Sequence, residues 1–293
     1  YNVDFNKGPI YQIVRANKAG TDWYKEITRT APIQQHSVGM SGGNAVSRFY
    51  VGFGYYNQEG VVLNTYLRRY TIRVNSEFTV HNRVRIGENI QIAYRDNPQL
   101  TNLDEGNAIS LAYRMNPLIP VYDEFGGWAG TAAKGFNNPS NPVANQTRAK
   151  YNKGHAFGIF GNVYAEVDLL KDLTFRSSFG GGLFSFYANG ITSKTYENSE
   201  NIGNDQLFEA GGYGHSWTWT NTARYQHTFG IHDFKVLAGI EAIRDGQGRS
   251  IDGTGLNPFT NAVNYRTLTT TQSSGRTVNS DGSPGNDIFS IFG

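Results

Sequence analysis

Residues 69–80 (RYTIRVNSEFTV) alternate between apolar and polar side chains with almost no exception. Because successive side chains of a β-strand point to opposite faces, this pattern predicts a strand with one apolar and one polar face. In a soluble sheet the apolar face would cover a core. In an outer-membrane barrel it would meet lipid, and the polar face would line the lumen. The alternation alone allows both arrangements.

The same period of two recurs along most of the chain. It predicts strands at about 34–41, 47–57, 68–80, 84–95, 155–168, 173–187, 214–229 and 233–244, with a ninth beginning near 287. Strands of globular proteins average only about five or six residues. A strand of about thirteen residues, tilted by about 45°, rises by roughly 30 Å, enough to cross an apolar band about 25 Å tall. We therefore expect an all-β fold, an antiparallel up-and-down sheet.

The connections between these strands alternate in length. The short ones are GGNAV, HNR, LLKD and GIH, and the longer ones lie at about 58–67, 96–154, 188–213 and 245–286. If consecutive strands are antiparallel neighbours, every short turn falls at one end of the sheet and every long loop at the other. Tight periplasmic turns opposite long outside loops are typical of an outer-membrane barrel. A soluble sandwich with unequal loops remains the alternative.

The apolar content of the chain depends strongly on aromatic residues, with 18 Tyr, 18 Phe and 4 Trp among 293 residues. No run approaches the roughly 18 consecutive apolar residues of a transmembrane helix, so any membrane crossing would use strands. Trp217, Trp219, Phe229 and Phe234 are expected near strand ends, as in an aromatic girdle. Aromatic packing in the core of a sandwich is the alternative.

Charge and side-chain chemistry exclude several functions. The formal net charge of +2 provides no basic field for nucleic acid, and the absence of cysteine removes thiol nucleophiles and thiolate metal sites. The six histidines show no metal-ligand spacing. Asp123 and Glu124 are adjacent on an extended segment, so they point in opposite directions and cannot flank one bond as acid and base. We predict no catalytic residues, no metal site and no cofactor, and hence no enzyme.

The connection at 96–154 is the longest, and long loops on a rigid scaffold often carry function. Within PVYDEFGGWAG, the rings of Tyr122 and Trp128 could stack on a sugar or peptide group, and Asp123 could accept hydrogen bonds from it. Together with Glu124, Asp123 could also hold a Ca²⁺. The alternative is that the two rings anchor the loop on itself while the carboxylates are solvated.

Several motifs in order along the chain carry a family resemblance. They are Thr21-Asp22-Trp23, Arg29-Thr30-Ala31-Pro32, Ser41-Gly42-Gly43-Asn44, GYYNQEG at 54–60 and Arg68-Arg69-Tyr70, followed by NPLIPVYDEFGGWAG, NPVA, GNVYAEVDLLKDLTFRSSFG, WTWTNTARYQHTFG and HDFKVLAGIEA. In this order they resemble the SusC/RagA family of TonB-dependent outer-membrane transporters. The resemblance covers nearly the whole chain.

The resemblance implies a barrel of roughly 22 strands with a plugged lumen. It also implies a location in the outer membrane of a Gram-negative bacterium, surrounded by lipid, and a SusD-like surface lipoprotein as partner. Such pairs import oligosaccharides or peptides, driven by the TonB complex. Residues 1–33 would lead into the barrel, and residues 34–293 would form eight to nine of its strands. The plug, the TonB-contacting part and the C-terminal strands would lie outside this sequence.

On this interpretation the polar side of the strands faces the lumen. The predicted lumen-facing residues are Arg69, Arg73, Asn75, Glu77, Asn89, Gln91 and Glu166. Their mixture of charged and amide groups suits neutral sugars and excludes no peptide. Two rival functions remain open at this point. One is a soluble or surface-attached β-rich carbohydrate-binding module or adhesin, and the other is an envelope hydrolase, which lacks a plausible nucleophile and base.

Overall fold

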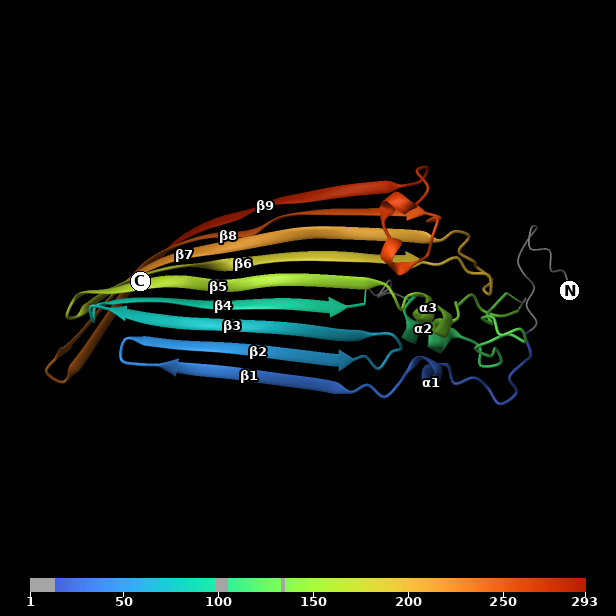
Figure 1. Ribbon diagram of the computed structural model, residues 1–293, viewed down its shortest axis with the longest axis horizontal. Coiled ribbons are helices and arrows are strands. Elements are labelled where there is room, and N and C mark those ends of the chain that lie inside the picture. The colour runs from blue at the N-terminus through green and yellow to red at the C-terminus, as the bar shows by residue number, and fades with distance from the viewer. Residues whose placement is uncertain (1–13, 99–104, 133–134) are drawn as a thin grey trace.

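A computed structural model describes residues 14–98, 105–132 and 135–293 of the chain. Their main feature is one nine-stranded antiparallel sheet whose strands are neighbours in chain order, as Figure 1 shows. The strands are β1 (Ile33–Gly43), β2 (Ser47–Glu59), β3 (Tyr66–Val80), β4 (Val84–Asn97), β5 (Lys153–Leu170), β6 (Leu173–Thr192), β7 (Gln206–Phe229), β8 (His232–Leu256) and β9 (Thr277–Phe292). The predicted all-β, up-and-down architecture is confirmed.

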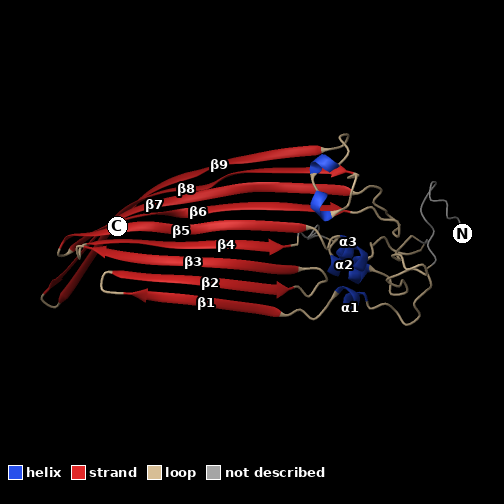
Figure 2. Ribbon diagram, in the orientation of Figure 1, coloured by secondary structure: helices blue, strands red, loops and turns tan. Residues whose placement is uncertain are grey.

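The connections differ in length at the two ends of the sheet. The short turns at 44–46, 81–83, 171–172 and 230–231 lie at one end, which we call the turn end. The long connections and all the helices lie at the other, the loop end (Figure 2). Each strand from β2 to β8 therefore runs between a short turn and a longer connection. The length asymmetry read from the sequence corresponds to two physically different ends of the sheet.

The later strands extend further toward the loop end than predicted. β6 continues to Thr192 and β7 begins at Gln206, within the predicted loop 188–213. β8 continues to Leu256, and β9 begins at Thr277 rather than near 287. These extensions are rich in Gly, Ser, Thr and Asn and show no apolar alternation. They form strands because each neighbour supplies a complete hydrogen-bonded ladder.

A β-bulge in β8 is one reason why apolar and polar residues do not alternate regularly along this strand. Trp217 pairs with Arg244 and His215 pairs with Gln247, so β8 holds one more residue than β7 at this point. Gly246, at φ +74°, adopts the left-handed conformation that glycine reaches without a Cβ clash. The extra residue exchanges the two faces of β8, which interrupts any period of two read along the sequence.

Three short helices gather at the loop end. They are α1 (Trp23–Ile27), α2 (Ala108–Arg114) and α3 (Pro142–Arg148). The helix α1 ends at Ile27, because Thr28 is extended and forms a β-bridge with Val62. The helices α2 and α3 lie within the predicted loop 96–154. The 3₁₀ helices η1 (Val263–Tyr265) and η2 (Leu268–Thr270) lie between β8 and β9.

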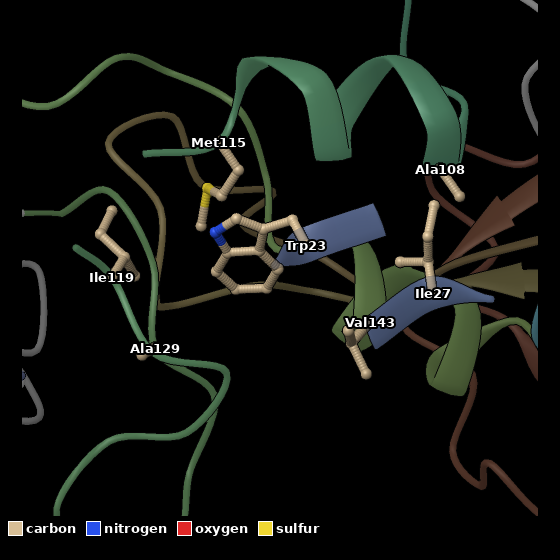
Figure 3. Packing of buried hydrophobic residues seen from close by; sticks show 7 residues of the cluster. All are labelled: Trp23, Ile27, Ala108, Met115, Ile119, Ala129 and Val143. Carbon is tan, nitrogen blue, oxygen red and sulfur yellow. The ribbon is translucent and has the colours of Figure 1, made fainter. Parts of the chain in front are cut away.

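A buried apolar core lies among these helices, while Ala188, Ile191 and Leu207 are buried on β6 and β7. Its members come from distant parts of the chain (Figure 3) and are Trp23, Ile27, Ala108, Met115, Ile119, Ala129 and Val143. The Trp23 indole also donates from Nε1 to the Asn116 carbonyl oxygen at 3.2 Å. We call residues 21–31, 105–132 and 135–152 the cap. The strands, by contrast, carry many exposed apolar side chains, such as Val38 at 73% and Phe160 at 68%.

Candidate functional site

The register of the strands places all seven predicted lumen-facing residues on one face of the sheet. Arg73 stands opposite Gln91, and Asn75 stands opposite Asn89. The Arg73 Nε donates to the Gln91 Oε1 at 2.9 Å. The Asn89 amide donates to the Asn162 Oδ1 at 3.1 Å on the next strand. Side-chain hydrogen bonds thus connect β3, β4 and β5 across this polar face.

Near the turn end, the polar face carries a network of ion pairs. Arg85 contacts Glu166 at 2.5 Å and Asp168 at 3.0 Å. Arg176 reaches the other oxygen of Glu166 at 3.3 Å from β6. Each carboxylate here has an arginine partner, so positive and negative charges balance locally.

Glu77 belongs to the same balanced region. It is paired with Arg48 on β2, and it accepts a hydrogen bond of 2.6 Å from the hydroxyl of Tyr164 on β5. The guanidinium of Arg176 lies 3.9 Å from the centre of the Tyr164 ring. The predicted residues Glu77 and Glu166 are therefore held in fixed positions by neighbouring strands.

A cavity of about 610 Å³ opens over the middle of the polar face, from β4 to β9. Its lining includes Gln91, Phe160, Phe184 and Ser216. Gly158, Gly182, Gly214 and Gly248 contribute backbone without side chains. The polar face is therefore the hollow side of the sheet, as the lumen side of a barrel wall would be.

The opposite face is apolar along most of its length. Ile72, Ile92 and Ile159 stand opposite one another on three successive strands. Toward the loop end a row of rings crosses β1 to β5, with centroid distances of 6.2, 5.2, 6.3 and 5.9 Å, through His36, Tyr55, Tyr70, Tyr94 and His155. Aromatic rows of this kind occur where a barrel wall passes from lipid to water. Within this face Glu88 accepts a hydrogen bond of 2.7 Å from Ser76.

Of the four aromatic residues predicted near strand ends, two lie there and two do not. Phe229 and Phe234 flank the turn at 230–231, at the ends of β7 and β8. Trp217 and Trp219 instead lie in the middle of β7, because this strand begins at Gln206 and is 24 residues long. The Trp219 indole donates to the Ser177 hydroxyl at 3.1 Å. Because the predicted strand began at residue 214 instead of 206, the two tryptophans were expected near its start.

Tyr122, Asp123 and Trp128 come together in one small turn of the cap. The rings of Tyr122 and Trp128 stack with centroids 5.0 Å apart. The Asp123 Oδ1 accepts hydrogen bonds from the backbone N–H groups of Phe125 at 3.0 Å and Gly127 at 2.7 Å. These contacts fix the turn internally, and Tyr122 remains 52% exposed. Contact of this turn with a substrate or a partner stays a prediction.

The turn is also joined to a neighbouring connection. The backbone N–H of Trp128 donates a hydrogen bond of 2.9 Å to the hydroxyl of Tyr196, which lies in the loop between β6 and β7. In the same loop, Glu197 is fully buried and accepts two hydrogen bonds from Arg148 of α3, at 2.6 and 3.0 Å. The cap and the β6–β7 loop therefore form one ordered structure above the strands.

The described residues include no group of three or more His, Cys, Asp or Glu side chains placed to hold a metal ion. The helices among them are too short or too polar to span a membrane. A Ca²⁺ held by loop carboxylates stays a prediction.

No protein-family model matches the chain. Among curated proteins, TonB-dependent receptor P3 of Formosa agariphila is 26% identical over 274 residues, covering 92% of this chain and 26% of the relative. TonB-dependent receptor SusC of Bacteroides thetaiotaomicron is 28% identical over 268 residues, covering 83% of this chain and 26% of the relative. The chain thus spans about a quarter of the length of these relatives.

Among solved structures, the RagAB peptide transporter superimposes with a TM-score of 0.72 at 20% identity, covering 99% of this chain and 32% of the matched chain. The closed-closed state of the RagAB peptide importer gives a TM-score of 0.70. The likeness therefore extends over the cap as well as the sheet. The chain therefore resembles a barrel segment of the SusC/RagA type in sequence and in fold.

Sequence reasoning missed the aromatic side chains of the polar face. Phe160 shares that face with Asn162, and Phe184 and Phe186 stack on β6 with centroids 5.8 Å apart. Phe160 is 68% exposed. Parity within the predicted strand 155–168 places Phe160 beside Asn162 and Tyr164, so this signal was present. It was hidden by the expectation that a polar face carries only polar residues.

Proposed function

We propose that this segment forms part of the wall of a TonB-dependent outer-membrane transporter. The observation that carries the proposal is the opposition of two faces on a single sheet. One face is polar, hollow and cross-linked by hydrogen bonds, and the other is apolar, exposed and crossed by a row of rings. Lipid on the apolar side and a wet lumen on the polar side account for both faces.

The wider activity follows from the relatives and is part of the proposal. A transporter of this type would work with a SusD-like surface lipoprotein over the loop end and with the TonB complex on the periplasmic side. It would import an oligosaccharide or a peptide in a Gram-negative bacterium. The ordered cap, which presents Tyr122 beside Trp128, supports the loop end as the place where substrate or lipoprotein is met.

A soluble or surface-attached β-rich binding module is the second candidate. In such a module the apolar face would need a second layer over it. Within the described residues only one sheet is present, and side chains of the apolar face such as Ile72 at 43% remain exposed. This favours the transporter.

Cell fractionation of the full-length protein tests the proposal. We expect it in the outer membrane, soluble only in detergent, with a gel mobility that changes on boiling because a closed barrel resists unfolding. Cells lacking TonB should lose uptake of its substrate. A full-length protein found in the periplasm or medium, soluble without detergent and unaffected by boiling, would contradict the transporter and favour the soluble module.

A further inference from the structure

The charges of the polar face are segregated along the strands. Near the turn end, Arg48, Arg85 and Arg176 each pair with a carboxylate. Toward the loop end the same face carries three exposed arginines, which are Arg69, Arg73 and Arg95. Among the described residues, no carboxylate lies within the 4.0 Å ion-pair distance of these three guanidinium groups. On β3 and β4 the loop-end part of the polar face is therefore cationic.

Without a bound anion, the placement of Arg69 and Arg95 destabilises the pairing of β3 with β4. Arg69 and Arg95 stand directly opposite each other on β3 and β4. Like charges at directly opposed positions destabilise a strand pair. By contrast, Arg68, one position away, points to the other face and lies 3.9 Å from Glu59. An anion between Arg69 and Arg95 would offset their repulsion.

Neighbouring side chains hold two of the arginines in place. The Arg69 guanidinium lies 5.4 Å from the centre of the Tyr56 ring, and the Tyr56 hydroxyl donates to Gln58 at 2.8 Å. The Nε of Arg73 is engaged by Gln91 at 2.9 Å. This leaves the terminal N–H groups of Arg73 to face the hollow. A planar guanidinium presents two parallel donors that match the geometry of a carboxylate.

A cavity of about 210 Å³ lies beside this cluster. It is lined by Tyr50, Tyr56, Arg69, Arg73 and Gln91, with Gly52 and Gly54 beneath. A Cβ added at Gly54 would meet nothing closer than the Thr71 Cβ at 3.8 Å, so the floor is open there, whereas the Tyr50 ring covers Gly52. Pockets for drug-sized ligands begin at about 300 Å³, so this cavity suits one unit of a longer ligand.

We propose that Arg69, Arg73 and Arg95, with Tyr56, form a carboxylate-binding subsite on the path of the substrate. The substrate is then an acidic oligomer, and not the neutral sugar that the mixed residue types indicated. Arg69 and Arg73 lie four positions apart on β3, roughly 13 Å along the strand. Two carboxylates of an extended oligomer can therefore be bound together. This inference rests on the proposed transport function.

The test uses the full-length transporter in detergent and matched pairs of probes. One pair is an oligogalacturonate and its methyl ester, and the other is an aspartate-rich peptide and its asparagine counterpart. The variants are Arg69→Gln, Arg95→Gln and their combination. Arg68→Gln is the matched control, because it removes an arginine from the opposite face. The change of gel mobility on boiling verifies that each variant is folded.

We expect the wild type to prefer at least one acidic probe over its neutral counterpart. The double variant should bind that probe roughly a hundredfold more weakly, since each charge-assisted contact contributes about tenfold. The Arg68→Gln variant should bind like the wild type. Which acidic probe is preferred distinguishes a uronic-acid glycan from an acidic peptide.

Two results would overturn the subsite. One is equal binding of acidic and neutral probes by the wild type, and the other is unchanged preference for the acidic probe in the double variant. Both results leave the transport function intact, provided that TonB-dependent uptake of any substrate is seen. Failure of the transport function has a different signature, which is the absence of the full-length protein from the outer membrane.

Discussion

At the scale of single residues, Val74 and Asn75 provide a direct test of which face meets lipid. They are neighbours in β3, and their side chains point to opposite faces. If Val74 lies at the middle of the bilayer, Val74→Arg should lower the unfolding free energy by about 2–4 kcal/mol. Asn75→Arg should be tolerated, because its side chain points to the hollow polar face.

Urea unfolding of the full-length protein in lipid vesicles measures both variants. Their ranking is more informative than either value, since the two substitutions add the same side chain to the same strand. A greater cost for Asn75→Arg would mean that the polar face is the packed one, and the barrel arrangement would be wrong.

The side chain of Asn141 makes four hydrogen bonds within the cap. Its Oδ1 accepts from the N–H groups of Val143 and Ala144 at the start of α3, at 3.0 and 3.1 Å. Its Nδ2 donates to the carbonyl oxygens of Val121 and Ala129, at 2.9 and 2.8 Å. Because Asn141 is fully buried, no water can replace these partners.

Asn141→Ala should therefore cost about 2–4 kcal/mol of cap stability, through the lost helix cap and the buried carbonyl groups left without donors. Asn141→Ser should recover about 1 kcal/mol of this, because serine also caps helices. Hydrogen exchange of the α3 amides measures both effects. Equal exchange rates in Asn141→Ala and the wild type would show that the cap does not depend on this residue.

At the scale of elements, the ion pair between Arg148 and Glu197 joins α3 to the β6–β7 loop. Glu197→Gln leaves the arginine charge in a largely buried position. We expect a cost of about 3–5 kcal/mol and faster proteolysis within residues 193–205. Glu105→Gln is the matched control, because Glu105 is 85% exposed and lies 3.8 Å from Arg114 in the same cap.

The control should change stability by less than about 1 kcal/mol, as exposed ion pairs usually do. Limited proteolysis of the full-length protein, followed by mass spectrometry, locates the cleavage sites. Similar cleavage in Glu197→Gln and Glu105→Gln would contradict the role of the buried pair as the connection between the two elements.

The elements also show how far sequence patterns predict this fold. Alternation placed β3 and β4 within two residues at each end, because both faces of these strands are chemically distinct. It failed where pairing, and not side-chain chemistry, maintains the strand, as beyond Arg244 of β8, where the strand continues to Leu256. The helices α2 and α3 were hidden in a long polar connection, although Asn107 and Asn141 precede them as helix caps.

At the scale of the whole molecule, the chain combines two structures held together by different forces. The sheet depends on continuous backbone ladders from β1 to β9. The cap depends on an apolar core whose members are as distant as Trp23 and Val143. Local patterns predict the first, since each strand carries its own alternation. They could not predict the second, because no local pattern indicates that these residues meet.

The two structures should therefore respond separately to a core substitution. Trp23 is 3% exposed in the cap, and Trp23→Ala should cost the cap about 3–5 kcal/mol. Tyr24→Ala is the control, because this neighbouring ring is 59% exposed. We expect Trp23→Ala to increase proteolysis within residues 105–152 and to leave the gel mobility change on boiling intact. Loss of that mobility change in Trp23→Ala alone would mean that the sheet requires the cap to form.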